Sequence, residues 1–182
     1  MKVSLNLIRK YVDLPEGLTD EQIAYDMTLR TVEVEDVENT AKKFHDIVVG
    51  EILEIKAHPN ADKLRICMVD IGEEEPVQIV CGGSNLYVGE HVVVSKPGAE
   101  VVWHGQGEPV KITKTKMRGE SSYGMICAST EVYLSDFFPN EGEEEIVDLK
   151  GFDCKPGDSV ADLFGMNDTV LEIDNKSLSN RP

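Results

Sequence analysis

The sequence of 182 residues carries 34 acidic and 18 basic side chains, a formal net charge of −16, and 41% of its residues are hydrophobic. This acidity argues against indiscriminate nucleic-acid binding, because the overall field of the protein repels a polyanion. No apolar run approaches the ~20 residues of a membrane span, and Arg9 and Lys10 interrupt what would be the apolar core of a signal peptide. We therefore expect a cytoplasmic protein with no membrane contact.

Two short helices and a strand are expected before residue 40. Ser4 is placed to cap a helix that runs to about Val12. Thr19 and Gln22 form a capping-box pattern, which predicts a second helix that ends near Leu29. Residues 31–35 alternate apolar and polar side chains, as a half-buried strand does. Nothing in this part of the chain indicates chemistry.

From residue 47 the pattern changes to short strands at regular spacing, separated by turns rich in Gly, Pro and Asn. The expected strands are residues 47–56, 64–71, 77–80, 91–95, 111–117 and 123–127. Short strands spaced in this way predict a small closed β-barrel, which avoids exposed sheet edges. The oligonucleotide-binding fold belongs to this class and takes nucleic acid on one face and its loops.

The last part of the chain completes the N-terminal helices rather than the barrel. Residues 156–159 read as a helix start, Val160, Leu163 and Phe164 as its apolar face, and residues 170–173 as a strand. The N-terminal helices are too small to form a stable core alone, so they need this partner. We predict an α+β fold in which a barrel of residues 40–150 is inserted into a small discontinuous α/β domain, residues 1–39 plus 151–182.

A cluster of cations marks the candidate binding site for nucleic acid. Residues 45–130 carry a net charge of −4, against −9 for residues 131–182. From Lys114 to Arg118, at the end of the predicted strand 111–117, the residues alternate, which places Lys114, Lys116 and Arg118 on one face. The hydroxyls and ring that follow can meet phosphate, ribose and base; they belong to Ser121, Ser122 and Tyr123. The alternative is a solvated edge strand whose lysines only discourage aggregation.

Two loops add candidate contacts to this cluster. The run His58-Pro59-Asn60-Ala61-Asp62-Lys63-Leu64 is a turn in which Lys63, with the nearby Arg65, can face a phosphate. His58 is either a ligand-contacting residue or a packing residue of the loop. Asn85 follows the flexible Gly82-Gly83 pair and either contacts the nucleic acid or braces the turn.

The same stretches resemble a known family. The runs His58 to Leu64, Val80-Cys81-Gly82-Gly83-Ser84-Asn85 and Lys116 to Met125 are together similar to the tRNA-binding domain family. The flanks, from Val3-Ser4-Leu5 at the start to Asn180-Arg181-Pro182 at the end, resemble the N-terminal region of the bacterial phenylalanyl-tRNA synthetase beta subunit.

This resemblance implies a fragment of a longer ligase subunit. It implies tRNA as a partner, an oligonucleotide-binding barrel, and a synthetase alpha subunit in a hetero-oligomer of two alpha and two beta chains. The parent enzyme would use ATP and Mg²⁺ to join phenylalanine to its tRNA, with its active site on the alpha subunit. The fragment itself would need no cofactor.

The fragment shows no catalytic constellation of its own. It has no Ser/His/Asp arrangement, no HExxH and no Walker sequence, so we predict that it is not an enzyme. Its four cysteines form no CxxC pair and predict reduced hydrophobic side chains rather than a metal site; they are Cys67, Cys81, Cys127 and Cys154. Two alternatives remain besides a tRNA-binding appendage of a synthetase, namely a protein-interaction or assembly module and a free-standing tRNA-binding protein.

Overall fold

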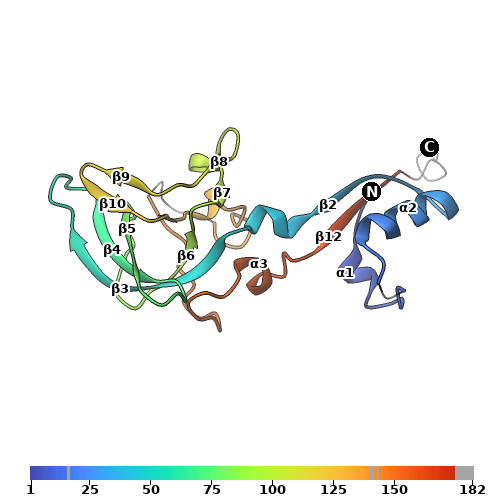
Figure 1. The fold of residues 1–182 in the computed structure, drawn as a ribbon, viewed down its shortest axis with the longest axis horizontal. Helices are drawn as coiled ribbons and strands as arrows, with labels where there is room; N and C mark the ends of the chain where they lie inside the picture. The colour runs from blue at the N-terminus through green and yellow to red at the C-terminus, as the bar shows by residue number, and fades with distance from the viewer. Residues whose placement is uncertain (16, 140–141, 143, 175–182) are drawn as a thin grey trace. The chain divides into compact units, whose positions relative to one another are not determined.

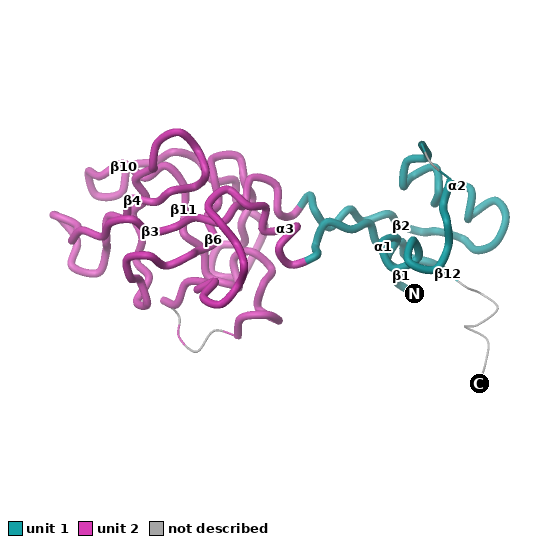
Figure 2. Tube along the Cα trace, turned by 90° about the horizontal axis from the view of Figure 1, so that it is seen from below, with its two compact units in different colours: residues 1–42, 165–182 teal, residues 43–164 magenta. Residues whose placement is uncertain are grey.

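The structure, a computed structural model, describes residues 1–15, 17–139, 142 and 144–174. The chain divides into two compact units (Figure 2). We call Met1–Lys42 with Gly165–Pro182 the small unit, and Lys43–Phe164 the barrel unit. Asn180-Arg181-Pro182, part of the resemblance described above, lies outside the described residues, as do Glu141 and Glu143.

The small unit is a three-stranded antiparallel sheet with two helices. Its elements are β1 (Lys2–Ser4), α1 (Leu5–Ile8), α2 (Asp20–Arg30), β2 (Glu33–Asn39) and β12 (Thr169–Asp174). The C-terminal strand β12 lies between β1 and β2, with Ile173 opposite Val34. Leu5 and Leu171 are fully buried in the core that the helices share with the sheet. The chain ends that are far apart in sequence therefore build one core.

Local signals in the sequence explain both helices. Ser4 caps α1 by accepting a hydrogen bond from the amide of Leu7, and Thr19 and Gln22 form both hydrogen bonds of a capping box at the start of α2. The first helix is shorter than the pattern predicts. It ends at Ile8, residues 9–13 including Val12 are exposed, and the chain returns to the core only at Leu14.

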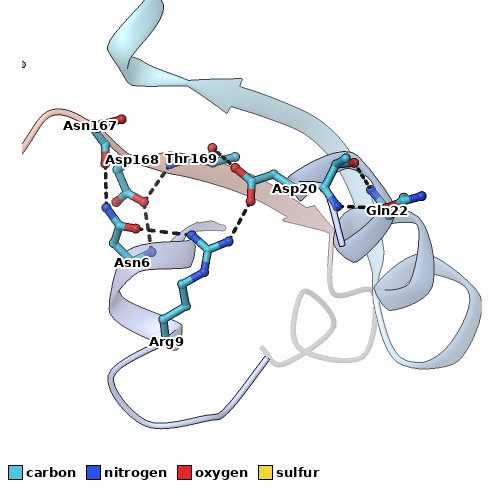
Figure 3. Close-up of polar contacts among 8 residues, drawn as sticks. Asn6, Arg9, Asp20, Gln22, Asn167, Asp168 and Thr169 are labelled. Carbon is cyan, nitrogen blue, oxygen red and sulfur yellow. Dashed lines mark hydrogen bonds and ion pairs between the residues drawn. The ribbon is translucent and has the colours of Figure 1, made fainter. Parts of the chain in front are cut away.

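Polar contacts fasten the helices to the start of β12 (Figure 3). The Asp168 carboxylate accepts a hydrogen bond from the amide of Asn6 at 3.0 Å. Asp20 forms an ion pair with Arg9 at 2.9 Å and accepts a hydrogen bond from the hydroxyl of Thr169. The hydrogen bonds to Asp168 and Thr169 span 162 and 149 residues of sequence, so α1 and α2 depend on the C-terminal segment for their position.

The barrel unit is built on a five-stranded antiparallel sheet (Figure 1). Its strands are β3 (Ile47–Ala57), β4 (Arg65–Asp70), β5 (Val77–Cys81), β6 (His91–Ser95) and β11 (Met125–Ile126), in the order β11-β6-β3-β4-β5. The Tyr123 amide, next to β11, donates a 2.8 Å hydrogen bond to the Gln78 carbonyl of β5. This bond joins the two edges of the sheet, so the sheet forms a nearly closed barrel, as the strand spacing predicts.

Alternating apolar side chains fill the barrel. Ile52, Val69, Ile79 and Val92 are fully buried inside it. Gly50 lets β3 cross its neighbours closely, since a Cβ there would lie 2.8 Å from methyl groups of two valines. Burial is the main cause that raises the pKa values of three free cysteines, to about 12 for Cys67 and Cys127 and about 11 for Cys81, which keeps these thiols protonated.

Short elements complete the barrel unit. Two are hairpins, β7 (Glu100–Val101) with β8 (Val110–Lys111) and β9 (Thr115–Met117) with β10 (Glu120–Ser122). Three are 3₁₀ helices, η1 (Thr40–Phe44, which begins in the small unit), η2 (Trp103–Gly105) and η3 (Ser129–Glu131). The last is the helix α3 (Val160–Leu163). The predicted strand 111–117 is thus two strands, β8 and β9. Residues 112–114 separate them; Ile112 is buried and its backbone still bonds to Gly98 and Ala99 beside β7, whereas Thr115 begins the pairing with β10.

The helix predicted near residue 160 belongs to the barrel unit and not to the small one. Residues 151–164 were expected to cover the small sheet. Instead, the Val49 amide of β3 donates a hydrogen bond to the backbone carbonyl of Asp158, and the Gly157 amide donates one to the backbone carbonyl of Val49, both at 2.9 Å. Val160 and Ala161 of α3 are buried, and Phe164 contacts the rings of Phe137, Phe138 and Phe152. The apolar face therefore packs on a barrel surface that the sequence pattern does not reveal.

Candidate nucleic-acid interface

The β9–β10 hairpin carries the predicted cation cluster. Its turn consists of Arg118 and Gly119, both at positive φ (49° and 102°), as a two-residue type I′ turn requires. In the ladder Lys116 lies opposite Ser121, and both are exposed. Opposite residues of an antiparallel pair share one face, so this ammonium and this hydroxyl point to the same side.

Lys114 and Tyr123 extend that face beyond the ladder. The Lys114 ammonium lies over the Tyr123 ring, 4.6 Å from its centroid. We call the surface of Lys114, Lys116, Ser121 and Tyr123, with Arg118 at its tip, the hairpin face. Arg118 is exposed in the turn, outside the strand. The sequence predicts one alternating strand, whereas in the structure Lys114 precedes β9, Lys116 lies in β9 and Arg118 lies in the turn. The hairpin still gathers the three cations.

The His58 loop is hydrogen-bonded to the backbone of this hairpin. His58 is 5% exposed; its Nδ1 accepts a 3.1 Å hydrogen bond from the Asn60 amide, and its Nε2 lies 3.0 Å from the Met117 carbonyl. The Asn60 side chain donates to the Arg118 carbonyl at 3.1 Å. Both ring nitrogens of His58 are thus occupied, and the position favours packing over ligand contact. The sequence predicts the turn at Asn60 but not that the Asn60 side chain would hydrogen-bond to the hairpin.

Lys63 and Arg65 lie next to this loop. The Lys63 ammonium pairs with Glu144 at 3.2 Å, and the two side chains are 85% and 56% exposed. An ion pair this exposed contributes ~1 kcal/mol or less, so it leaves Lys63 available to a phosphate. Arg65 donates from Nη1 to the carbonyls of Asp62 and Leu64, at 2.8 and 3.0 Å, and so holds the end of the loop.

Asn85 and Ser122 are bonded to the backbone of the barrel. Asn85 donates to the Ile146 carbonyl and accepts from the Ile146 amide, at 3.1 and 3.0 Å. The buried Ser122 hydroxyl accepts from the Val80 amide and donates to the Gly124 carbonyl. These two candidates therefore fix the fold, and only Ser121 of the serine pair is exposed on the hairpin face.

Gln78 is a second residue that the sequence reasoning did not single out. Its side-chain amide donates a hydrogen bond to the backbone carbonyl of Ser121 at 2.9 Å. Its backbone carbonyl accepts a hydrogen bond from the backbone amide of Tyr123. It therefore joins the base of the hairpin to β5. No local signal marks this role, because the partner lies 43 residues further along the chain.

The described ranges contain neither a metal site nor a membrane-spanning helix. Among those residues, no group of three or more His, Cys, Asp or Glu side chains could hold a metal ion. In the same part of the chain, no helix is both long and apolar enough to pass through a membrane. An exposed basic surface with one aromatic ring and a hydroxyl suits an RNA backbone and its bases.

Comparison with known proteins identifies the fold that carries this surface. A family described as "Putative tRNA binding domain" matches residues 47–158. The chain belongs to this family. The matched residues of the tRNA-binding domain include the His58 loop, the hairpin face and the segment that ends before α3. The predicted resemblance of the barrel is therefore confirmed, with the barrel fold that it implies.

Curated relatives match both flanks as well as the tRNA-binding domain. The chain is 38% identical to the "Phenylalanine--tRNA ligase beta subunit" of Halalkalibacterium halodurans, covering 96% of this chain and 21% of the relative. It is 40% identical to the protein of the same name from Bacillus licheniformis, covering 95% and 21%. The predicted resemblance to this subunit is confirmed, and the chain spans about a fifth of the length of these relatives.

One solved structure carries a similar sequence over a shorter stretch. The C-terminal domain of Plasmodium vivax p43 is 27% identical and covers 44% of this chain and 43% of its own, with a TM-score of 0.33. A structural likeness of this size supports no argument about the arrangement of the barrel.

Proposed function

We propose that the barrel unit binds tRNA through the hairpin face, as part of a phenylalanine–tRNA ligase beta subunit. The observation that carries this proposal is the grouping of Lys114, Lys116 and Arg118 on one exposed hairpin of a tRNA-binding domain. Lys63 stands on the neighbouring loop and adds a fourth exposed cation. Phosphate contacts of this kind position a protein on RNA, while the ring of Tyr123 offers a contact to a base.

The parent enzyme would attach phenylalanine to its tRNA with ATP and Mg²⁺. The names of the relatives support a ligase subunit, and a beta subunit implies an alpha partner, which we propose as part of an assembly of two alpha and two beta chains in the cytoplasm. In this proposal the barrel unit holds tRNA while another part of the enzyme performs the chemistry. The role of the barrel unit in this proposal is recognition of the tRNA.

The test replaces the three hairpin cations by alanine. With ~0.7 per phosphate contact on single-stranded RNA, three contacts give a log–log salt slope of about −2 for tRNA affinity. The triple variant should bind more weakly and lose this part of the slope. A matched variant with alanine at Lys10, Lys42 and Lys155, all exposed and outside the hairpin face, changes the net charge equally and should keep the slope. Equal slopes in the two variants, with folding verified by circular dichroism, contradict the proposal.

A second candidate function is protein docking within the synthetase. Phe137 and Phe152 are 50% and 43% exposed in a cluster of four rings on the barrel unit. Exposed aromatic clusters are typical of protein interaction surfaces. Unchanged tRNA affinity in the triple variant would favour this assembly role over RNA binding.

A further inference from the structure

The ring of Tyr123 is held firmly at the edge of the barrel. Its backbone amide donates to the Gln78 carbonyl at 2.8 Å, and the half-buried side chain packs against the barrel core. One side of the ring is therefore fixed by the fold. Such a ring loses little conformational freedom when a ligand stacks on it, which favours its use as a contact surface.

The solvent side of the same ring is already occupied. The Lys114 ammonium lies 4.6 Å from the ring centroid, within the ~6 Å range of a cation–π contact. Lys114 is exposed, so this contact forms at the surface of the hairpin face. A stacked nucleobase needs the space where the ammonium now lies, and the two cannot occupy it together.

We propose that Tyr123 is a base-stacking residue and that Lys114 covers it in the free protein. On binding, an unpaired nucleobase takes the place of the ammonium, and Lys114 turns to a phosphate of the same strand. This inference rests on the proposed tRNA-binding function and adds its ligand subsite. The site accepts any base, because each base has a π-face, and it requires a base that is free of its own stack, as in a loop or at an end.

The magnitudes favour this exchange. An exposed cation–π contact contributes about a two- to fivefold effect on an equilibrium constant. Stacking a base on an aromatic side chain contributes about five- to 150-fold. When the Lys114 ammonium leaves the ring, it gains a charge-assisted hydrogen bond to the phosphate next to the stacked base. Lys116, two residues further along on the same face, makes no cation–π contact with a ring of the described part of the chain, so it has no such contact to lose.

A double-mutant cycle on tRNA affinity tests the exchange. The variants are Lys114→Ala, Tyr123→Leu and the two combined. In the unmodified protein, Lys114→Ala removes a phosphate contact but also removes the group that competes with the base. With Tyr123→Leu the ring is absent, so Lys114→Ala removes only the phosphate contact. We expect its effect on affinity to be two- to fivefold larger in the Tyr123→Leu background.

The control is Lys116→Ala, which should weaken binding by the same factor in both backgrounds. Tyr123→Phe keeps the ring and should behave as the unmodified protein in the cycle. If Tyr123→Leu does not fold, the Tyr123 ring resonances in the unmodified protein decide. A single-stranded oligonucleotide should then shift them strongly by ring stacking, whereas inorganic polyphosphate should produce a smaller change.

The outcomes separate this inference from the function on which it rests. If tRNA does not bind the unmodified protein, both are wrong. If tRNA binds with a salt slope near −2 but Lys114→Ala has the same effect in both backgrounds, the tRNA-binding function stands and the exchange is refuted. Equal ring shifts from the oligonucleotide and from polyphosphate refute it in the same way.

Discussion

Glu90 makes the stability of the barrel unit depend on pH. Its side chain is 0% exposed, one carboxylate oxygen accepts a 3.0 Å hydrogen bond from the Tyr87 amide, and the other has no hydrogen-bond partner among the described residues. Burial is the main cause that raises the pKa of Glu90 from 4.5 to about 7; the Tyr87 amide opposes it and the charge of Asp148 adds to it. The folded protein therefore holds a proton that the unfolded chain releases near pH 4.5.

The size and sign of the effect follow from this pKa. Between pH 4.5 and about 7 the folded state binds more protons than the unfolded state, so the free energy of unfolding falls as the pH rises through this window. Each unit of pKa corresponds to ~1.4 kcal/mol, so the loss is about 3 kcal/mol by pH 8. Below pH 4.5 the contribution of Glu90 is fully present.

Glu90→Gln replaces the carboxyl group by a neutral group of the same shape. We expect the variant to match the unmodified protein near pH 4.5 and to be about 3 kcal/mol more stable at pH 8. Urea unfolding followed by the fluorescence of Trp103 measures this in the barrel unit, because the sequence contains one tryptophan. Glu74→Gln, at an exposed position between β4 and β5, is the control and should keep the pH dependence. The same loss of stability between pH 5 and pH 8 in Glu90→Gln and in the unmodified protein would refute the reasoning.

Two further predictions concern the strand β12 that completes the small sheet and the His58 side chain that holds the hairpin of the barrel unit. Deleting residues 165–182 removes the middle strand of the small sheet, so residues 1–39 should lose hydrogen-exchange protection while the barrel unit keeps its own; protection of residues 1–39 in the truncated chain would show that they pack elsewhere. His58→Phe keeps a ring but removes its hydrogen bonds with the Asn60 amide and the Met117 carbonyl, and urea unfolding should show a loss of about 1–3 kcal/mol. His45→Phe, at an exposed ring, should change the free energy of unfolding by less than ~0.5 kcal/mol.

The parts of the fold that the sequence predicts are those with local causes. The capping box at Thr19 lies within one turn of helix, and it forms as expected. The barrel follows from short apolar strands between Gly- and Pro-rich turns, since such strands have few ways to bury one face and avoid free edges. Alternation predicts that the three cations gather, but only Lys116 lies in a strand; Lys114 precedes β9 and Arg118 lies in the turn, so the hairpin itself brings them together.

The parts that the sequence does not predict depend on partners far away in the chain. Asn85 and Ser122 have the groups that RNA contacts need, yet their partners, Ile146 and Val80, are 61 and 42 residues distant. The same holds for α3, whose apolar face suits the small sheet and the barrel equally in sequence. Which side a polar group faces is a property of the packed structure, and alternation alone cannot assign it.

The pairing of β2 with β12 has a consequence for the order of folding. The Thr40 hydroxyl and the Asp168 carbonyl that it contacts are 128 residues apart in sequence, and everything between them passes through the barrel unit. Closing a flexible loop of that length opposes folding by about 4 kcal/mol. During synthesis β1 and β2 emerge long before β12, so the small sheet stays incomplete until the last strand has left the ribosome.

A barrel that has already folded removes most of this barrier, because it replaces a long flexible loop by a compact body whose two ends continue into neighbouring strands. Folding of the small unit therefore depends on the barrel unit, but folding of the barrel unit does not depend on the small one. All strands of the barrel lie within Lys43–Phe164, so the barrel can form without the small unit. Damage to the barrel core should therefore unfold both units, whereas damage to the small sheet should leave the tRNA-binding domain intact.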